Sequence, residues 1–159
     1  MEYKIRKMKD EEYPLLNEFL YEALFVPDGI MPPRNIITSP ELQIYVDHFG
    51  SLKDDFALVA EIKEKIVGAV WVRIMNDYGH IDNKTPSLAI SLYKKYRGQG
   101  IGTDMMKEML SLLKVHGYKR VSLSVHKANY AAKMYEKIGF KIVKENKDEL
   151  IMLWQEISH

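Results

Sequence analysis

Cysteine is missing from all 159 positions of the sequence. This absence excludes disulfide bonds, thiolate metal sites and a cysteine nucleophile. The histidines show no H-E-x-x-H or other paired metal spacing, so no metal site is predicted. A G-x-S-x-G nucleophile elbow is also lacking, which argues against a serine hydrolase.

Long apolar runs are missing as well. No stretch approaches the roughly 18 apolar residues that a membrane-spanning helix requires. The N-terminal residues 1–5 lack the apolar core of a signal peptide. We therefore expect a cytoplasmic protein that has no membrane partner.

Neither sign of charge dominates the composition. Lysine and arginine together number 23 and aspartate and glutamate 22, which gives a formal net charge of +1, and 47% of the residues are hydrophobic. This balance is typical of a soluble globular protein, and the length suits one domain over residues 1–159. The basic cluster 94–97 is better explained by a phosphate ligand or a solvated edge than by nucleic acid, which we do not expect as a partner.

Residue spacing divides the first half of the chain into five regular elements. Strands are predicted at 3–6, 56–60 and 66–72, and helices at 11–25 and 40–50. Asp10 is the expected N-cap of the first helix, and Ser39, followed by Pro40, that of the second. The segment 26–34 holds three of the six prolines and is therefore a long, shaped loop.

The second half begins with the polar segment 76–86. Strands are predicted at 88–92, 121–125, 140–143 and 150–157, and helices at 103–116 and 129–138. A strand, a helix and another strand in immediate succession form the crossover that parallel strands need. The sequence thus predicts an α/β (α+β) domain with a mixed, mostly antiparallel sheet of about seven strands, about four flanking helices and one parallel β-α-β step.

A glycine-rich turn, Arg97-Gly98-Gln99-Gly100-Ile101-Gly102, connects the strand ending at Leu92 to the helix beginning near Thr103. Glycines allow positive φ and close approach of a ligand, and the first N–H groups of a helix attract anions. No Lys-Ser/Thr pair follows the turn, and its third glycine comes one residue too early for G-x-G-x-x-G. A nucleotide-type pyrophosphate is the expected ligand, and a turn serving only chain reversal is the alternative.

This unit, together with Asn129, Ala131, Tyr135 and the Gly139-Phe140 pair, resembles the GNAT superfamily of acyl-CoA-dependent N-acetyltransferases. The resemblance is strong over residues 88–143 and looser elsewhere. It implies a GNAT-like sheet and acetyl-CoA (coenzyme A) as the cofactor. The backbone of the turn would hold the pyrophosphate, and the strand before it would pair with the pantetheine arm, for which strands 88–92 and 121–125 would splay. The residues implied in cofactor binding are Ile90, Ser91, Leu92, Arg97, Gly98, Gln99, Gly100, Ile101, Gly102, Thr103, Asn129 and Tyr135.

Amine acetylation requires a base, an oxyanion donor and an acid, because an ammonium has a pKa of about 10 and the departing thiolate one of about 8.5. The resemblance implies that Tyr135 is the general acid and that the backbone N–H of Leu92 polarises the thioester carbonyl. A core aromatic is the alternative interpretation of Tyr135, and a simple helix cap that of Asn129. Without cysteine, transfer must be direct.

The resemblance does not place the general base. Many relatives carry an acidic residue on the strand that here begins with Ser87 and Leu88. A water relay is the leading hypothesis. Glu61, His80 and His126 are further candidates, although each is more typical of a solvated side chain.

The expected acceptor is the primary amine of a small molecule or an amino-acid-like compound. It would enter between the proline-rich loop and the segment joining the third and fourth strands, where the candidate wall residues are Phe25, Pro27, Met31, Trp71, Arg73 and Tyr78. The apolar loop favours a compact acceptor with an apolar part over a highly charged polyamine. An alternative acceptor is the N-terminus of a protein or peptide, and an alternative function is a non-catalytic acyl-CoA sensor. For the oligomeric state, a homodimer stays open.

Overall fold

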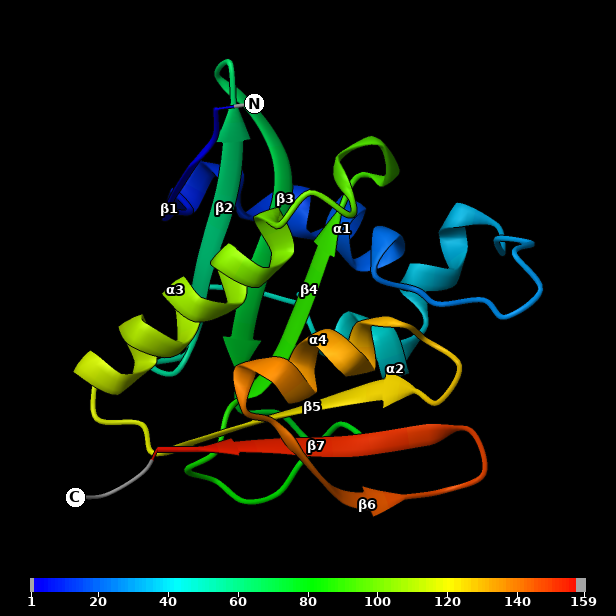
Figure 1. Cartoon of the computed structure of the whole chain (residues 1–159). Coiled ribbons are helices and arrows are strands. Elements are labelled where there is room, and N and C mark those ends of the chain that lie inside the picture. Colours follow the sequence, from blue (N-terminus) through cyan, green and yellow to red (C-terminus); the bar gives the residue numbers. More distant parts are fainter. Residues whose placement is uncertain (1, 157–159) are drawn as a thin grey trace.

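The computed structural model describes residues 2–156 and arranges them as one sheet with helices on both faces (Figure 1). The strands are β1 (Lys4–Lys7), β2 (Phe56–Ile62), β3 (Lys65–Arg73), β4 (Ser87–Leu92), β5 (Arg120–His126), β6 (Lys141–Glu145) and β7 (Glu149–Gln155). The α-helices are α1 (Leu16–Glu22), α2 (Pro40–Gln43), α3 (Ile101–Val115) and α4 (Ala131–Ile138). Short 3₁₀ helices are η1 (Asp10–Leu15), η2 (Arg34–Thr38) and η3 (Lys94–Tyr96).

The strand order in the sheet is β1-β2-β3-β4-β5-β7-β6. Only β4 and β5 are parallel among the described strand pairs, and α3 is the crossover between them. This arrangement confirms the predicted fold class, including the single parallel step.

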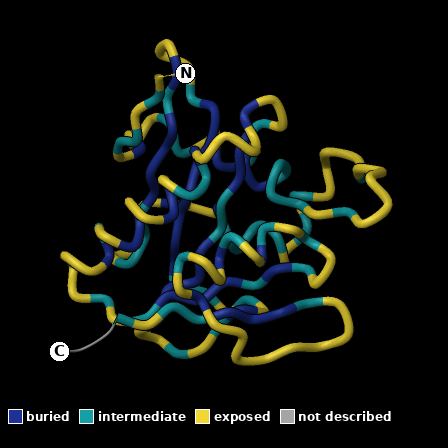
Figure 2. Tube along the Cα trace, in the orientation of Figure 1, coloured by how far each residue is buried: buried dark blue, intermediate teal, exposed yellow. Residues whose placement is uncertain are grey.

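Two apolar layers hold the helices to the sheet. α3 and α4 lie over one face, in front in Figure 1, and α1 and α2 lie behind it. The first layer contains the methionine stripe of α3, in which Met105, Met106 and Met109 are fully buried against the strands. The second contains Phe19 of α1 and Trp71 of β3. Figure 2 shows the central strands buried and the connecting loops exposed.

The first predicted helix is shorter and less regular than expected. Residues 10–15 form the 3₁₀ helix η1, capped by Lys9 rather than Asp10, and only 16–22 are α-helical. Pro14 lies inside this stretch and has no N–H to donate to the carbonyl of Asp10, so the hydrogen bond that would close the first α-helical turn cannot form.

The second predicted helix is also shorter. Ser39 and Pro40 start it as expected, but α2 ends at Gln43 instead of reaching Gly50. The guanidinium of Arg73 explains the early end, because one of its nitrogens donates to the carbonyls of Ile44 (3.0 Å) and Asp47 (2.8 Å). These carbonyls would otherwise accept bonds within the helix.

Other element ends differ by a few residues. α3 begins at Ile101 rather than Thr103, directly after Gly100 at φ 88°. Phe140 precedes β6 and is almost fully buried, so it anchors the strand rather than extending it. β7 ends at Gln155, and the predicted end of this strand at Ile157 lies outside the described residues. None of the described helices combines the length and apolar character that crossing a membrane demands.

Candidate active site

The two parallel strands separate soon after they meet. Their only register pair is Ser87 with Ser122, where the Ser122 N–H donates to the carbonyl of Pro86 (3.0 Å). Beyond this pair β4 and β5 diverge, and α4 crosses in front of the opening (Figure 1). The predicted splay is therefore present, and it leaves one edge of β4 without a neighbouring strand.

The backbone of β4 presents free groups to this opening. Tyr93 donates its N–H to the carbonyl of Val67 on β3 (3.0 Å). Because N–H and C=O directions alternate along a strand, the odd-numbered residues of β4 bond to β3, and Ile90 and Leu92 direct their backbone groups toward β5. The Leu92 carbonyl accepts a bond from Arg97 Nε (2.9 Å), so the Leu92 N–H and both backbone groups of Ile90 face the opening.

Ser91 has a structural contact of its own. Its Oγ is buried and donates to the carbonyl of Phe19 on α1 (2.6 Å). This bond ties α1 to the face of β4 opposite α3. The Ser91 side chain therefore points away from the crossover helix.

The glycine-rich turn leaves open space around its backbone. Gly98 and Gly100 adopt φ of 75° and 88°, and a Cβ placed at either would meet no atom within 4 Å. Gly100 is the N-cap of α3 and has no side chain to bond the first N–H groups of that 15-residue helix. The N–H groups of Ile101, Gly102 and Thr103 are consequently available to an anion at the positive end of the helix dipole.

Arg97 supports the turn instead of offering its amide to a ligand. Its N–H already donates to the Lys94 carbonyl (3.2 Å), and its guanidinium bonds to the carbonyl (3.1 Å) and carboxylate (3.3 Å) of Glu22. The Arg97 N–H is thus already occupied, and pyrophosphate binding by the backbone of the following residues stays a prediction. Gln99 is likewise held, with its side-chain amide donating to the Lys95 carbonyl (3.3 Å).

These groups fit coenzyme A chemically. A pyrophosphate needs several converging donors, which the start of α3 supplies, and the glycines leave room for it. A pantetheine arm carries amide groups that can pair with a free strand edge, which β4 supplies at Ile90 and Leu92.

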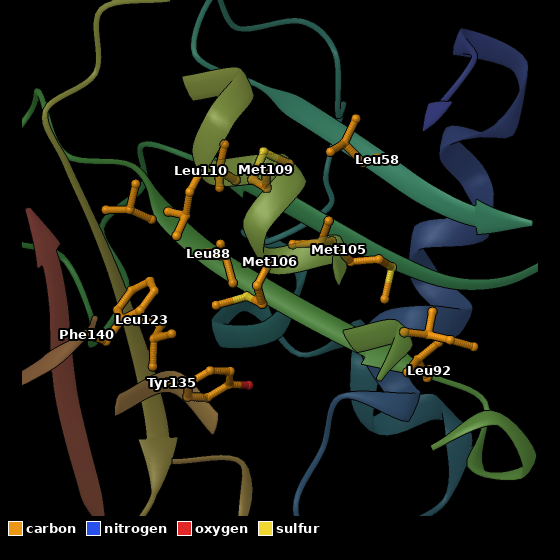
Figure 3. Packing of buried hydrophobic residues seen from close by; sticks show 14 of the residues in the cluster. Leu58, Leu88, Leu92, Met105, Met106, Met109, Leu110, Leu123, Tyr135 and Phe140 are labelled. Carbon is orange, nitrogen blue, oxygen red and sulfur yellow. The ribbon is translucent and has the colours of Figure 1, made fainter. Parts of the chain in front are cut away.

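Tyr135 lies where α4 faces the opening. Its side chain is 7% exposed, and its ring packs against Phe140 with the centroids 6.1 Å apart. Figure 3 shows the hydroxyl directed away from Phe140, and it forms no hydrogen bond with any described residue. Burial raises the pKa of this phenol to about 12, so the group keeps its proton at neutral pH.

Asn129 lies two residues before α4, which begins at Ala131 rather than directly after Asn129. Its Oδ1 accepts a bond from the N–H of Ala131 (2.9 Å), and its carbonyl accepts one from Ala132 (3.2 Å). These bonds hold the turn that leads into α4, whose N-cap position is occupied by Tyr130. Its side-chain amide nitrogen has no bond among the described residues.

The other face of the opening is bounded by an aromatic pair. Phe25, which follows α1, stacks on His126 at the end of β5 with ring centroids 5.1 Å apart and an interplanar angle of 35°. The His126 Nδ1 accepts a bond from the Ala128 N–H (3.0 Å), which leaves Nε2 as the protonated nitrogen of the neutral ring. Phe25 is 38% exposed, so part of the ring is open to an incoming molecule.

Two predicted wall residues lie in the core instead. Trp71 is 1% exposed, and its indole N–H donates to the Tyr45 carbonyl (3.1 Å). Arg73 is 4% exposed and forms a two-pronged ion pair with the fully buried carboxylate of Asp55 (3.0 and 2.8 Å). Both side chains are occupied by structural bonds, so neither lines an open surface. Met31 and Tyr78, by contrast, are exposed.

The carboxylate suggested as a remote base is engaged elsewhere. Glu61 binds Arg6 (3.1 Å) and Lys4 (3.3 Å) at the outer strands β1 and β2, and β3 separates it from β4. The Arg6 hydrogen bond lowers the pKa of Glu61, which makes it a weaker base. His80 is closer to β5, since the neighbouring Gly79 carbonyl accepts a bond from Ser122 Oγ (2.8 Å). The His80 Nδ1 is buried without a partner among the described residues.

A polar group at the closed end of the splay was not predicted from the sequence. Asp77 accepts bonds from Ser87 Oγ (2.9 Å) and from the Tyr45 hydroxyl (3.0 Å). Burial and the charge of Asp77 raise the pKa of Tyr45. Asp77 belongs to the polar segment 76–86, where no periodicity or motif distinguishes one residue from another, so only the folded chain reveals it.

Comparisons with known proteins agree with this geometry. The model of the "Acetyltransferase (GNAT) family" matches residues 18–140. An N-alpha-acetyltransferase of Sulfurisphaera tokodaii is 30% identical over 148 residues, which are 86% of this chain and 84% of that protein. An uncharacterized N-acetyltransferase of Bacillus subtilis is 32% identical over 85 residues, 53% of this chain, but the match covers 32% of that longer protein. The crystal structure of the PaiA N-acetyltransferase of Thermoplasma acidophilum with coenzyme A has a similar fold (TM-score 0.73, 22% identity, 98% of this chain and 100% of that one).

Proposed function

This chain belongs to the acetyltransferase (GNAT) family, and on that premise we propose that it transfers an acetyl group from acetyl-CoA directly to the primary amine of a small-molecule or amino-acid-like acceptor. The observation that carries the proposal is the unpartnered hydroxyl of Tyr135 at an opening edged by the free backbone groups of Ile90 and Leu92, with the pKa of the phenol raised by burial. Acyl transfer from a thioester requires a proton donor for the leaving sulfur and an N–H donor for the carbonyl oxygen, and the opening supplies both kinds of group.

Each of these groups has a separate task. Acetyl-CoA, when bound, supplies an acetyl group activated as a thioester. The start of α3 and the edge of β4 would hold it, and the Leu92 N–H would donate to the carbonyl oxygen on which negative charge develops. Tyr135 holds at its Oη a proton that can be given to a departing sulfur, and its raised pKa keeps that proton in place until then.

The apolar surface beside the opening supports a compact acceptor. Phe25, Ile30 and Met31 are 38%, 74% and 42% exposed, and they belong to or border the loop that follows α1. Exposed apolar side chains next to a reaction site favour an acceptor that carries an apolar part. A long polyamine would bring several charges to a loop that contains one acid, Asp28, and no matching row of carboxylates.

The α-amino group of a protein or peptide is the second candidate. It is favoured by the similarity to the Sulfurisphaera tokodaii protein, which is named an N-alpha-acetyltransferase and matches 86% of this chain. A chain end also presents one amine beside a variable side chain, which the loop after α1 could contact.

The experiment is a comparison of acceptors at one saturating acetyl-CoA concentration, with release of free thiol as the readout. Aryl-alkyl amines, amino acids, short peptides and spermidine would be ranked by kcat/KM. The proposal predicts the highest values for aryl-alkyl amines or amino acids. Clear preference for peptides would establish the second candidate, and preference for spermidine would contradict both. Tight acetyl-CoA binding without thiol release for any acceptor would instead favour a non-catalytic acyl-CoA sensor.

A further inference from the structure

One carboxylate near the opening differs from the other acids of the protein. Glu149, the first residue of β7, is partly buried, and its carboxylate forms neither an ion pair nor a hydrogen bond with any residue from 2 to 156. The other partly buried acids in this range are bonded: Glu61 to Arg6, Asp55 to Arg73, and Asp77 to Tyr45. The same holds for Glu12, Glu18, Glu22, Asp54, Asp82 and Glu156.

Leaving a half-buried carboxylate without a partner costs stability, because part of its hydration is lost and no protein charge replaces it. The lysine that follows β5 is engaged with another acid, because Lys127 pairs with Glu145 of β6 (3.2 Å). Burial, and then the neighbouring charge of Asp148, raise the pKa of Glu149, although His126 opposes this effect. An incoming cation would relieve this cost.

The strand register places Glu149 at the acceptor side of the opening. Glu149 is the direct cross-strand partner of His126, so the two side chains point to the same face of the sheet. That face is the one covered by α1 and the following loop, because the His126 ring stacks on Phe25. Val125 and Leu150, the next pair along, point to the opposite face and join the layer under α3 and α4.

A second aromatic residue reaches the same place. The Tyr45 hydroxyl bonds to Asp77 at the closed end of the splay, and the charge of Glu149 contributes to the raised pKa of Tyr45 after burial and Asp77. Glu149 is thus the cross-strand neighbour of His126 and is close enough to Tyr45 for its charge to act on that hydroxyl. A carboxylate beside exposed aromatic surface suits a ligand that has one positive charge next to an apolar body.

We propose that Glu149 binds the ammonium group of the acceptor and that Phe25 and His126 contact the apolar part attached to it. This inference rests on the proposed function and narrows its substrate class to singly charged amines with an apolar or aromatic neighbour, such as aryl-alkyl amines. Glu149 acts here as a specificity residue. It contacts the positively charged ammonium group of the acceptor before the acetyl group is transferred.

The test is direct binding of an acceptor to the protein saturated with coenzyme A, so that no turnover is needed. Phenethylamine and its uncharged analogue 2-phenylethanol would be titrated calorimetrically into the wild type, Glu149→Gln and Asp148→Asn. Glutamine keeps the size of the side chain and removes its charge. Asp148 is the adjacent, exposed acid, and its carboxylate has no bond within residues 2–156, so its variant removes the same charge from the same hairpin.

The expected result is selective. In Glu149→Gln the Kd of phenethylamine should rise on the order of 10-fold, the usual scale for losing a hydrogen-bonded charge pair. The Kd of 2-phenylethanol and that of coenzyme A should stay unchanged, and Asp148→Asn should behave as the wild type. A merely structural role for Glu149 would weaken both ligands equally.

Three outcomes would overturn the inference: an unchanged phenethylamine Kd in Glu149→Gln, an equal loss for both ligands, or the same shift in Asp148→Asn. A failure of the proposed function is seen separately, as the absence of thiol release by the wild type with any amine. Thermal melting of each variant would confirm that it is folded.

Discussion

Ser87 Oγ donates a 2.9 Å hydrogen bond to Asp77 at the one position where β4 still pairs with β5. The chain carries a serine where many relatives of the GNAT superfamily carry an acid, and the preceding loop brings a carboxylate to the same point. Asp77 also accepts the Tyr45 hydroxyl, so it joins the loop, β4 and the segment after α2. This contact fixes the closed end of the splay from which the opening widens.

Replacing Ser87 by Ala should therefore loosen the closed end. Ser87 is buried, and its loss removes one of the two hydrogen bonds that Asp77 accepts. We expect a loss of roughly 1–3 kcal/mol in the free energy of unfolding, measured by urea denaturation. Ser111→Ala, on the outer part of α3, is the control and should change stability by less than about 0.5 kcal/mol. Equal stability of the two variants would mean that the Ser87–Asp77 hydrogen bond contributes nothing to the free energy of unfolding.

Gly100→Val tests the phosphate-binding role of the turn against simple backbone strain. A β-branched residue resists positive φ and would place its side chain in the space left for the pyrophosphate. Gly117, at the far end of α3, has the same φ of 88° and equally open surroundings, so Gly117→Val carries the same strain. Calorimetry should show coenzyme A binding lost in the first variant and retained in the second. Equal affinities in two folded variants would make the turn purely structural.

The buried ion pair of Arg73 should matter for stability and not for cofactor binding. Removing the guanidinium in Arg73→Ala leaves the Asp55 carboxylate buried and unpaired, together with the carbonyls of Ile44 and Asp47. A loss of about 3–5 kcal/mol is expected in denaturant unfolding. Arg34→Ala breaks the exposed pair with Glu18 (3.5 Å) and the exposed contact of the guanidinium with the Tyr21 ring (4.8 Å), and should cost about 1 kcal/mol or less. Similar losses in the two variants would contradict this assignment.

Much of this architecture could be predicted from the sequence because it depends on local patterns. The methionine stripe of α3, the alternation of β5 and the glycines after α3 and α4 each specify their element directly, and all are found. The same holds for the glycine-rich turn, in which Gly98 and Gly100 adopt the positive φ that their spacing suggests.

Long-range contacts explain what could not be predicted. α2 ends early because Arg73, which is distant in sequence, donates a hydrogen bond to the Ile44 carbonyl just after the helix. Trp71 is a core residue because its indole N–H bonds to the Tyr45 carbonyl beside it. Glu149 becomes prominent only when register places it opposite His126. Hydrophobic periodicity carries no information on such pairs, since they depend on which strands become neighbours.

Acid should weaken the contact between η1 and β1. Hydrogen bonds from Arg6 (2.9 Å each) lower the pKa of Glu12 from 4.5 to about 2. Because the folded-state pKa is the lower one, this stabilisation is complete above pH 4.5 and is lost as the pH falls toward 2. In urea denaturation, the stability difference between the wild type and Glu12→Gln should be largest at neutral pH and shrink across this range. A difference that stays constant with pH would contradict the assigned pair.

The most direct test of the central claim is thiol release by Tyr135→Phe in the presence of acetyl-CoA and an amine that the wild type acetylates. Phenylalanine keeps the packing against Phe140 and removes only the hydroxyl. We predict an unchanged acetyl-CoA Kd and a kcat reduced on the order of 10²-fold or more, the scale expected for losing a positioned proton donor. Wild-type turnover by this variant would contradict the account, because departure of the thiolate would then not depend on Tyr135.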